Sequence, residues 1–400
     1  MKRENIAIAL SFIGLMFFSV GFAMGINSFL IPTLQASLNL SSGVAYLLLA
    51  ATFTPFLIWG IPASMLISKI GYQRTMALAF LIFSCAFGLF VASARVESFA
   101  LFLLASFVSG SANSILQTAI NPYITILGPM ESAAKRMSIM GICNKLAWPI
   151  APLFFSILVA NTANVTIEDL YLPFYIIISI FFILSIVSLL APLPEVTAMG
   201  ESDDDEVVDS NNDYSLGKTS IWQFPHLILG AVTLFIYVGV ETLSLSTVVD
   251  YAISLGLDNP DMYAWIPSVG MVIGYICGIL FIPKYLSQDL AMRICASIGV
   301  LGSLILVLSP AEISIWMILP ISLGCSLMWP ALWPLAMADL GRFTKRGSGL
   351  LTMAIAGGAV IPPLFGALKD ILPMQQAYWL AVPCFVFIFY YGFIGYKIRK

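Results

Sequence analysis

Long apolar runs, broken by short clusters of charged residues, proline and glycine, dominate this chain. No Asp, Glu, Lys or Arg occurs between Glu4 and Lys69, whereas one helix needs only about 20 apolar residues to cross a bilayer. The runs are roughly twice the length of a barrel strand and do not alternate strictly, which favours helices over sheet. We predict twelve spans, at residues 6–30, 44–67, 75–94, 98–126, 137–160, 170–191, 225–254, 262–283, 290–309, 312–337, 347–367 and 376–396.

The composition supports membrane insertion and excludes several classes of protein. Of the 400 residues, 60% are hydrophobic and 10% are charged, against about 25% charged in soluble domains. So few charges cannot cover a water-facing surface, which excludes a soluble enzyme, a secreted disulfide protein and a nucleic-acid binder. The chain is predicted to be an all-α polytopic membrane protein. Lys2 and Arg3 precede an apolar run without a convincing cleavage site, so we expect a retained first helix.

Metal and cofactor chemistry have no sequence signal. The six cysteines lie in apolar stretches without a CxxC pair, and His226 is the single histidine. Cysteines in such positions are typically small buried hydrophobic residues. We also find no nucleophile–base pair and no phosphate loop, so we expect no cofactor, no metal and no enzymatic activity.

Basic residues indicate the orientation of the spans. If both termini are cytoplasmic, fifteen of the 18 Lys and Arg residues fall in cytoplasmic segments, Arg95 and Lys369 fall outside, and Lys145 lies within a span. Because cytoplasmic loops carry an excess of Lys and Arg, this asymmetry predicts cytoplasmic N- and C-termini. We expect a multi-pass protein of the cytoplasmic (inner) membrane, acting as a monomer in the lipid bilayer.

One polar segment divides the chain. Between Ala191 and Gln223 lie eight of the 21 acidic residues, interleaved with Gly, Ser and Asn. Such a stretch cannot bury enough apolar area to fold, so we predict a flexible cytoplasmic linker at 192–224, between six-span bundles at 1–191 and 225–400. A regulatory or metal-binding acidic loop is the alternative.

The two bundles carry related patterns. Three short segments of the first bundle recur in the second, at offsets of 213, 210 and 211 residues. In the first bundle they are Leu127-Gly128-Pro129, Lys135-Arg136 and Pro152-Leu153-Phe154. In the second they are Leu340-Gly341-Arg342, Lys345-Arg346 and Pro363-Leu364-Phe365. Two similar six-helix bundles in the same orientation predict pseudo-two-fold symmetry, with a central site reached alternately from each side.

Polar residues inside the fourth and fifth spans are candidates for lining that site, since hydrocarbon disfavours them elsewhere. In span 4, Ser109, Asn113, Gln117 and Asn121 are spaced four apart and form one stripe. Hydrogen bonding between helices is the alternative role. In span 5, Asn144 and Trp148 share a face, and an amide beside an aromatic ring suits the hydroxyls and C–H faces of a sugar. Packing at a proline kink is the alternative for Trp148.

Three ionisable residues inside or near the spans have different expected roles. Glu241 lies deep in span 7, with no formal charge between Lys218 and Asp250. An unpaired carboxylate there tends to take up a proton, which suits cation coupling, although structural carboxyls of this kind also exist. Asp250 is predicted to be interfacial. Lys145 either faces the cavity or extends toward water, and the sequence does not decide its role.

Several longer stretches follow one family pattern. They are Asn-Pro-Tyr-Ile-Thr-Ile-Leu-Gly-Pro at 121–129, then Asn144, Tyr-Val-Gly-Val-Glu at 237–241, and Trp-Pro-Ala-Leu-Trp-Pro-Leu-Ala at 329–336. With these residues the chain resembles the fucose:proton symporter family of the major facilitator superfamily, especially its glucose/galactose-transporter branch. The resemblance covers nearly all of the chain outside the acidic linker. It implies a twelve-span fold and a sugar-like substrate.

Two positions depart from that pattern. The fucose symporter pattern has an Asp after the first-span Asn and a Glu four residues before the Asn-Pro, where this chain has Ser28 and Gln117. The resemblance implies that those acids handle protons, and neither Ser nor Gln can titrate in their place. Glu241 is then the one clearly mid-membrane acid.

Together these features predict a secondary transporter that moves a monosaccharide, such as a hexose, an amino sugar or fucose, by alternating access. We expect Glu241 to couple transport to a proton or sodium ion. The residues expected to contact sugar are Asn27, Asn113, Gln117, Asn144 and Trp148. The alternatives are an uncoupled sugar facilitator, a transporter of the same fold for a drug, peptide or nucleoside, and a non-transporting sugar sensor.

Overall fold

The computed structural model describes residues 3–126, 133–159, 165–191, 214, 217–282, 285–340 and 343–398. Within these ranges every regular element is a helix, and twelve segments are long and apolar enough to cross a membrane. The twelve predicted spans are therefore confirmed. Most of the predicted acidic linker and the Leu-Gly-Pro run at 127–129 lie outside the described residues.

The first six spans comprise both continuous and broken helices. Spans 1, 3, 4 and 5 are single helices: α1 (Arg3–Ser37), α5 (Tyr72–Val96), α6 (Phe99–Ile126) and α7 (Ala133–Leu158). Span 2 is divided into α2 (Ser42–Ala45), α3 (Leu47–Phe53) and α4 (Pro55–Ile70), and span 6 comprises the 3-10 turn η2 (Glu168–Leu170) and α8 (Tyr171–Leu190).

The last six spans are more often interrupted. Span 7 comprises α9 (Pro225–Ser246) and α10 (Val248–Ser254), span 8 η5 (Pro260–Ala264) and α11 (Trp265–Phe281), and span 9 α12 (Gln288–Leu308). Span 10 comprises α13 (Ala311–Ser314), η6 (Ile315–Met317), α14 (Ile318–Ser326) and α15 (Met328–Met337). Span 11 comprises α16 (Thr344–Ala354), η8 (Ile355–Ala359) and α17 (Ile361–Lys369), and span 12 α18 (Met374–Ala377), η9 (Tyr378–Leu380), α19 (Ala381–Phe393) and η10 (Gly395–Lys397).

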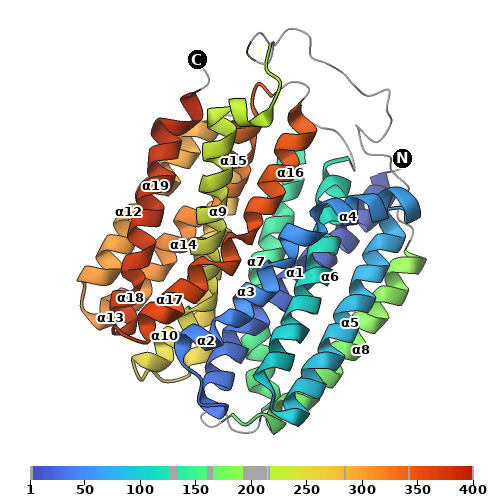
Figure 1. Cartoon of the computed structure of the whole chain (residues 1–400), viewed down its shortest axis with the longest axis vertical. Helices are drawn as coiled ribbons and strands as arrows, with labels where there is room; N and C mark the ends of the chain where they lie inside the picture. The colour runs from blue at the N-terminus through green and yellow to red at the C-terminus, as the bar shows by residue number, and fades with distance from the viewer. Residues whose placement is uncertain are drawn as a thin grey trace.

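The first and last six spans lie side by side (Figure 1). We call spans 1–6 the first half and spans 7–12 the second half. Both ends of the chain lie at the same end of the molecule, and α2, α10 and α18 lie at the opposite end, here called the distal end. Apolar side chains on the outside of α8 are 44–56% exposed, as suits contact with lipid: Ile180, Phe182, Ile183 and Ile186.

The break in span 11 brings the two halves together. At Gly357 a Cβ atom would lie 1.7 Å from the carbonyl oxygen of Phe235 in span 7, and at Gly358 one would lie 2.7 Å from the ring of Phe53 in span 2. These two positions need glycine because the backbone has no room for a side chain. Span 11 therefore contacts its own half on one side and the first half on the other.

Candidate functional site

A buried ion pair joins the two halves. The ammonium of Lys145, on α7, lies 3.1 Å from a carboxylate oxygen of Glu241, on α9, and each side chain is only 11% exposed. The sequence shows no counter-ion near Glu241, because Lys145 belongs to a distant span in the other half. The expectation of an unpaired carboxylate was wrong, because Lys145 is its partner.

Close packing of α1 fixes the residues around Lys145. A Cβ at Gly21 would lie 2.0 Å from the carbonyl oxygen of Asn144, and one at Gly25 would lie 2.5 Å from that of Trp148. Small residues four apart allow two membrane helices to approach this closely. The side-chain nitrogen of Asn144 donates a hydrogen bond to the carbonyl of Phe17, at 3.1 Å. The packing of α1 therefore sets the position of both predicted sugar contacts in span 5.

Trp148 combines an apolar face with an unused hydrogen-bond donor. Its ring centre lies 5.7 Å from the ammonium of Lys145, and its side chain is 95% buried. The indole nitrogen has no hydrogen-bond partner within the described part of the chain. Because a buried indole N–H usually finds a partner, this nitrogen can donate to a bound molecule.

The amides of the first half are engaged with one another and with nearby helices. Gln117 is half-buried and donates a hydrogen bond to Asn113 at 2.9 Å, whereas Asn113 itself is buried. Asn27 donates to the hydroxyl of Thr52, at 3.4 Å. Among the described residues, Asn27, Asn144 and the Asn113–Gln117 pair therefore belong to three separate hydrogen-bonded groups. The structure does not gather these amides into one contact.

Spans 1 and 7 meet near Asn27 and Glu241. The hydroxyl of Ser28, the residue after Asn27, donates to the carbonyl of Leu245, one turn beyond Glu241, at 3.3 Å. The helices that carry Asn27 and Glu241 are therefore neighbours across the two halves.

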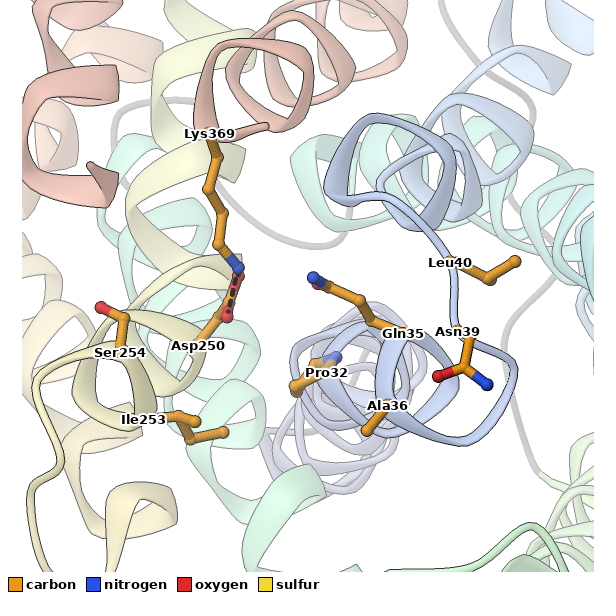
Figure 2. A pocket seen from close by; sticks show the side chains of 9 residues that line it. All are labelled: Pro32, Gln35, Ala36, Asn39, Leu40, Asp250, Ile253, Ser254 and Lys369. Atoms are coloured by element: carbon orange, nitrogen blue, oxygen red, sulfur yellow. Dashed lines mark hydrogen bonds and ion pairs between the residues drawn. The ribbon is translucent and has the colours of Figure 1, made fainter. Parts of the chain in front are cut away.

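A second charged cluster lies at the distal end (Figure 2). The carboxylate of Asp250 accepts hydrogen bonds from the ammonium of Lys369, at 2.7 and 2.8 Å, and from the hydroxyl of Tyr46, at 2.9 Å. Asp250 is only 4% exposed, because these partners cover its carboxylate. Because Tyr46 belongs to the first half, the cluster bridges the halves. A cavity of about 510 Å³ lies beside it, lined also by Gln35 and Asn39.

Two more contacts hold the distal end together. The carboxylate of Asp370 accepts hydrogen bonds from the backbone nitrogens of Ser42 and Gly43, at 2.6 and 2.8 Å. Burial alone would raise the pKa of Asp370, but these hydrogen bonds lower it below its ordinary value. Ser156 donates to Asp261 across the halves as well. Sequence reasoning missed this closure, although opposite charges near the ends of spans 7 and 11 were a signal for it.

The six cysteines are free thiols. Within the described residues no group of three or more His, Cys, Asp and Glu side chains is placed to hold a metal ion. The groups that the described residues place between the halves therefore include the Lys145–Glu241 ion pair, amides, hydroxyls, carboxylates and aromatic rings.

Known proteins resemble this chain over nearly its whole length. Residues 13–363 match the Major Facilitator Superfamily. A glucose/galactose transporter of Brucella abortus biovar 1 (strain 9-941) is 31% identical, with 99% of this chain and 96% of that protein aligned. A putative glucose/galactose transporter of Helicobacter pylori (strain ATCC 700392 / 26695) is 28% identical over 99% of both. The L-fucose-proton symporter of Escherichia coli (strain K12) is 24% identical over 94% of this chain and 90% of its own.

Solved structures share the fold. The crystal structure of the transporter FucP in the outward conformation superimposes with a TM-score of 0.72, at 22% identity over 99% of both chains. A bacterial homolog of the human lysosomal transporter Spinster, in an inward-facing conformation, gives 0.69 at 14% identity over 100% of this chain and 98% of its own. The chain thus belongs to the Major Facilitator Superfamily, in the family of the glucose/galactose transporters, and is a multi-pass membrane protein with the twelve-helix fold of that superfamily.

Proposed function

We propose that this protein carries a monosaccharide across the cytoplasmic (inner) membrane by alternating access, in symport with a cation. The observation that carries the proposal is the buried Lys145–Glu241 pair between the halves, next to Trp148. Ionisable residues inside a membrane protein are expensive and mark a substrate or ion pathway. The sugar transporters that align with the whole chain support a sugar as the substrate.

The proposed roles follow the chemistry of each side chain. Glu241 binds the cation, and Trp148 offers its ring to the C–H face of the sugar and its unpartnered N–H to a hydroxyl. The amide residues then exchange their present hydrogen bonds for bonds to sugar hydroxyls: Asn27, Asn113, Gln117 and Asn144. No covalent step is part of this proposal.

The orientation and organisation belong to the same proposal. Both termini face the cytoplasm, the distal end faces outward, and residues 192–224 link bundles at 1–191 and 225–400. The protein acts as a monomer. The excess of basic residues in the segments assigned to the cytoplasm supports this orientation.

Two measurements on the purified protein test the function. Sugars that bind the folded state raise its melting temperature, so D-glucose, D-galactose, L-fucose and N-acetylglucosamine are screened for stabilisation. Proteoliposomes loaded with a stabilising sugar are then assayed for saturable exchange with labelled sugar outside. Stabilisation by a sugar without exchange would indicate a sensor. Exchange of a drug, peptide or nucleoside, and not of a sugar, would show that the substrate belongs to that other class.

A further inference from the structure

The Lys145–Glu241 pair holds a charge of each sign at the boundary along which the halves must separate. Lys145 belongs to span 5 of the first half and Glu241 to span 7 of the second, and both side chains are nearly buried. Close to this point α7 lies against α11, where a Cβ at Gly141 would lie 3.0 Å from the ring of Tyr275. The pair is therefore part of a tight contact between the halves.

We propose that Lys145 competes with the transported proton for Glu241, so that a proton and a sugar together release the pair. The proton adds to the carboxylate of Glu241, and the ammonium of Lys145, now without its acceptor, donates to a sugar hydroxyl. This inference rests on the proposed function and assigns to Lys145 the role of a positioning and coupling residue.

The cost of separating buried charges is what links the two ligands. Opposite charges attract strongly where little water reaches them, and removing one partner leaves the other uncompensated. A proton alone neutralises Glu241 but leaves Lys145 without an acceptor. A sugar alone offers hydroxyl oxygens to Lys145 but leaves the carboxylate charged. With both the proton and the sugar bound, Glu241 is neutral and Lys145 has a hydroxyl acceptor, so the halves can separate without leaving a buried charge unpaired.

The surroundings of Glu241 offer no other charge to take the place of Lys145. The groups that face its carboxylate are Tyr237 on its own helix, Tyr275 on α11, Cys325 on α14 and Lys145 on α7. The two phenols and the thiol are neutral at physiological pH. Among the described residues, Lys145 is therefore the charged group that lies against this buried carboxylate.

The local chemistry also indicates what kind of sugar fits. A hydroxyl that accepts from Lys145 would lie near the Trp148 ring, and a neighbouring hydroxyl that accepts from the indole N–H would lie at the edge of the ring, in its plane. This arrangement suits a neutral ring with adjacent hydroxyls. A sugar acid would compete with Glu241 for Lys145 and bring a second negative charge to the pair.

The test uses the purified full chain in proteoliposomes, with D-galactose as the probe sugar and a pH-sensitive dye for proton uptake. We compare the wild type with Lys145→Met, Lys145→Arg and the double variant Lys145→Met/Glu241→Gln, and use Lys69→Met, at an exposed lysine, as the matched control. Sugar exchange, sugar accumulation under an imposed proton gradient, and proton uptake on sugar addition are measured for each.

The expected pattern separates coupling from transport. The wild type, Lys69→Met and Lys145→Arg take up protons when sugar is added and accumulate sugar. Lys145→Met exchanges sugar but takes up no proton on sugar addition, because sugar no longer has an ammonium to draw away from Glu241. The double variant, which strands no charge, exchanges sugar without dependence on pH.

Other results overturn the proposal. Sugar-induced proton uptake at the wild-type level in Lys145→Met would show that Lys145 does not compete for Glu241. Accumulation of sugar by the double variant under a proton gradient would show that coupling does not need this pair. This second result can be read even if Lys145→Met alone fails to fold. If the wild type accumulates sugar under a sodium gradient and not under a proton gradient, the ion that competes with Lys145 for Glu241 is not a proton. An absence of exchange by the wild type with any sugar would instead contradict the proposed function itself.

Discussion

At the scale of single residues, Gln117 occupies the position where the fucose:proton symporter pattern has a titratable Glu. Its amide donates to Asn113 one turn earlier on α6, and its side chain is partly exposed. An amide both donates and accepts hydrogen bonds but carries no charge, so it can bind a hydroxyl at any physiological pH. Gln117 is therefore suited to sugar recognition and not to proton transfer.

Replacing Gln117 with alanine is expected to weaken sugar binding and leave folding intact. Loss of a hydrogen bond that leaves its partner unpaired costs about 1–3 kcal/mol, or roughly 5–150-fold in affinity. The measurement is the dissociation constant of the stabilising sugar for the purified variant. Thr118→Ala is the control, because that neighbouring hydroxyl bonds to the carbonyl of Ser114 within its own helix. Unchanged affinity together with a lower melting temperature would assign Gln117 to helix packing.

The partner of a buried charge was the part of the site that the sequence could not predict. Helical periodicity gives the depth and face of Glu241 and of Lys145 within their own spans. It does not state which face of span 5 meets span 7, because that depends on how the halves pack. The same applies to Asp250, Lys369 and Tyr46, which come from three different spans.

At the scale of helices, the contact between α1 and α7 determines where the span-5 residues lie. Gly21 and Gly25 place the α1 backbone directly against the backbone of Asn144 and Trp148. The twelve spans themselves were predictable, because a run of apolar residues long enough to cross a bilayer is a local property. The interruptions in spans 2, 10 and 11 were not predicted, since their geometry depends on neighbouring helices.

A methyl group at Gly21 is expected to disturb this contact. In Gly21→Ala the new Cβ would lie 2.0 Å from the Asn144 carbonyl oxygen, so α1 and α7 must move apart. Overpacking of this kind costs about 1–3 kcal/mol. Both the melting temperature and the sugar affinity should fall. In Gly88→Ala, where nothing lies within 4 Å of the new Cβ, the melting temperature should hold or rise. Equal behaviour of the two variants would contradict this role of Gly21.

At the scale of the whole molecule, the orientation in the membrane can be tested by labelling. In a cysteine-free background, an impermeant maleimide should modify Asn259→Cys, an exposed position between α10 and η5, in intact cells. Lys69→Cys, in the last turn of α4, and Ser210→Cys, in the acidic linker, should react only after the cells are permeabilised. Labelling of Ser210→Cys in intact cells would reverse the proposed orientation.

Alternating access requires the distal end to open, and the contacts there oppose opening. Asp370 binds the backbone of Ser42 and Gly43, Asp250 binds Tyr46, and Asp261 binds Ser156, each across the halves. Every one of these contacts must break when the distal end separates. Their combined strength therefore helps to set the population of the open form in the absence of sugar.

Removing the Asp370 carboxylate is expected to raise that population. The reporter is Ser246→Cys, because Ser246 ends α9 and is 1% exposed in this closed arrangement. Loss of a capping carboxylate costs about 1 kcal/mol, so Asp370→Asn should speed labelling of the reporter roughly fivefold. Glu312→Gln, an exposed acid on α13 at the same end, is the control and should leave the rate unchanged.

The pH dependence of labelling gives the same contact a second test. Because the pKa of Asp370 is lowered in the closed form, its contribution to closure is complete above the ordinary Asp pKa, near 3.9, and is lost as the pH falls through the lowered pKa. Divided at each pH by the labelling rate of the exposed Asn259→Cys, which corrects for the falling thiolate fraction, labelling of the reporter should therefore accelerate on acidification into that range, and Asp370→Asn should remove this part of the pH response. A pH response that survives unchanged in Asp370→Asn would contradict this role of Asp370.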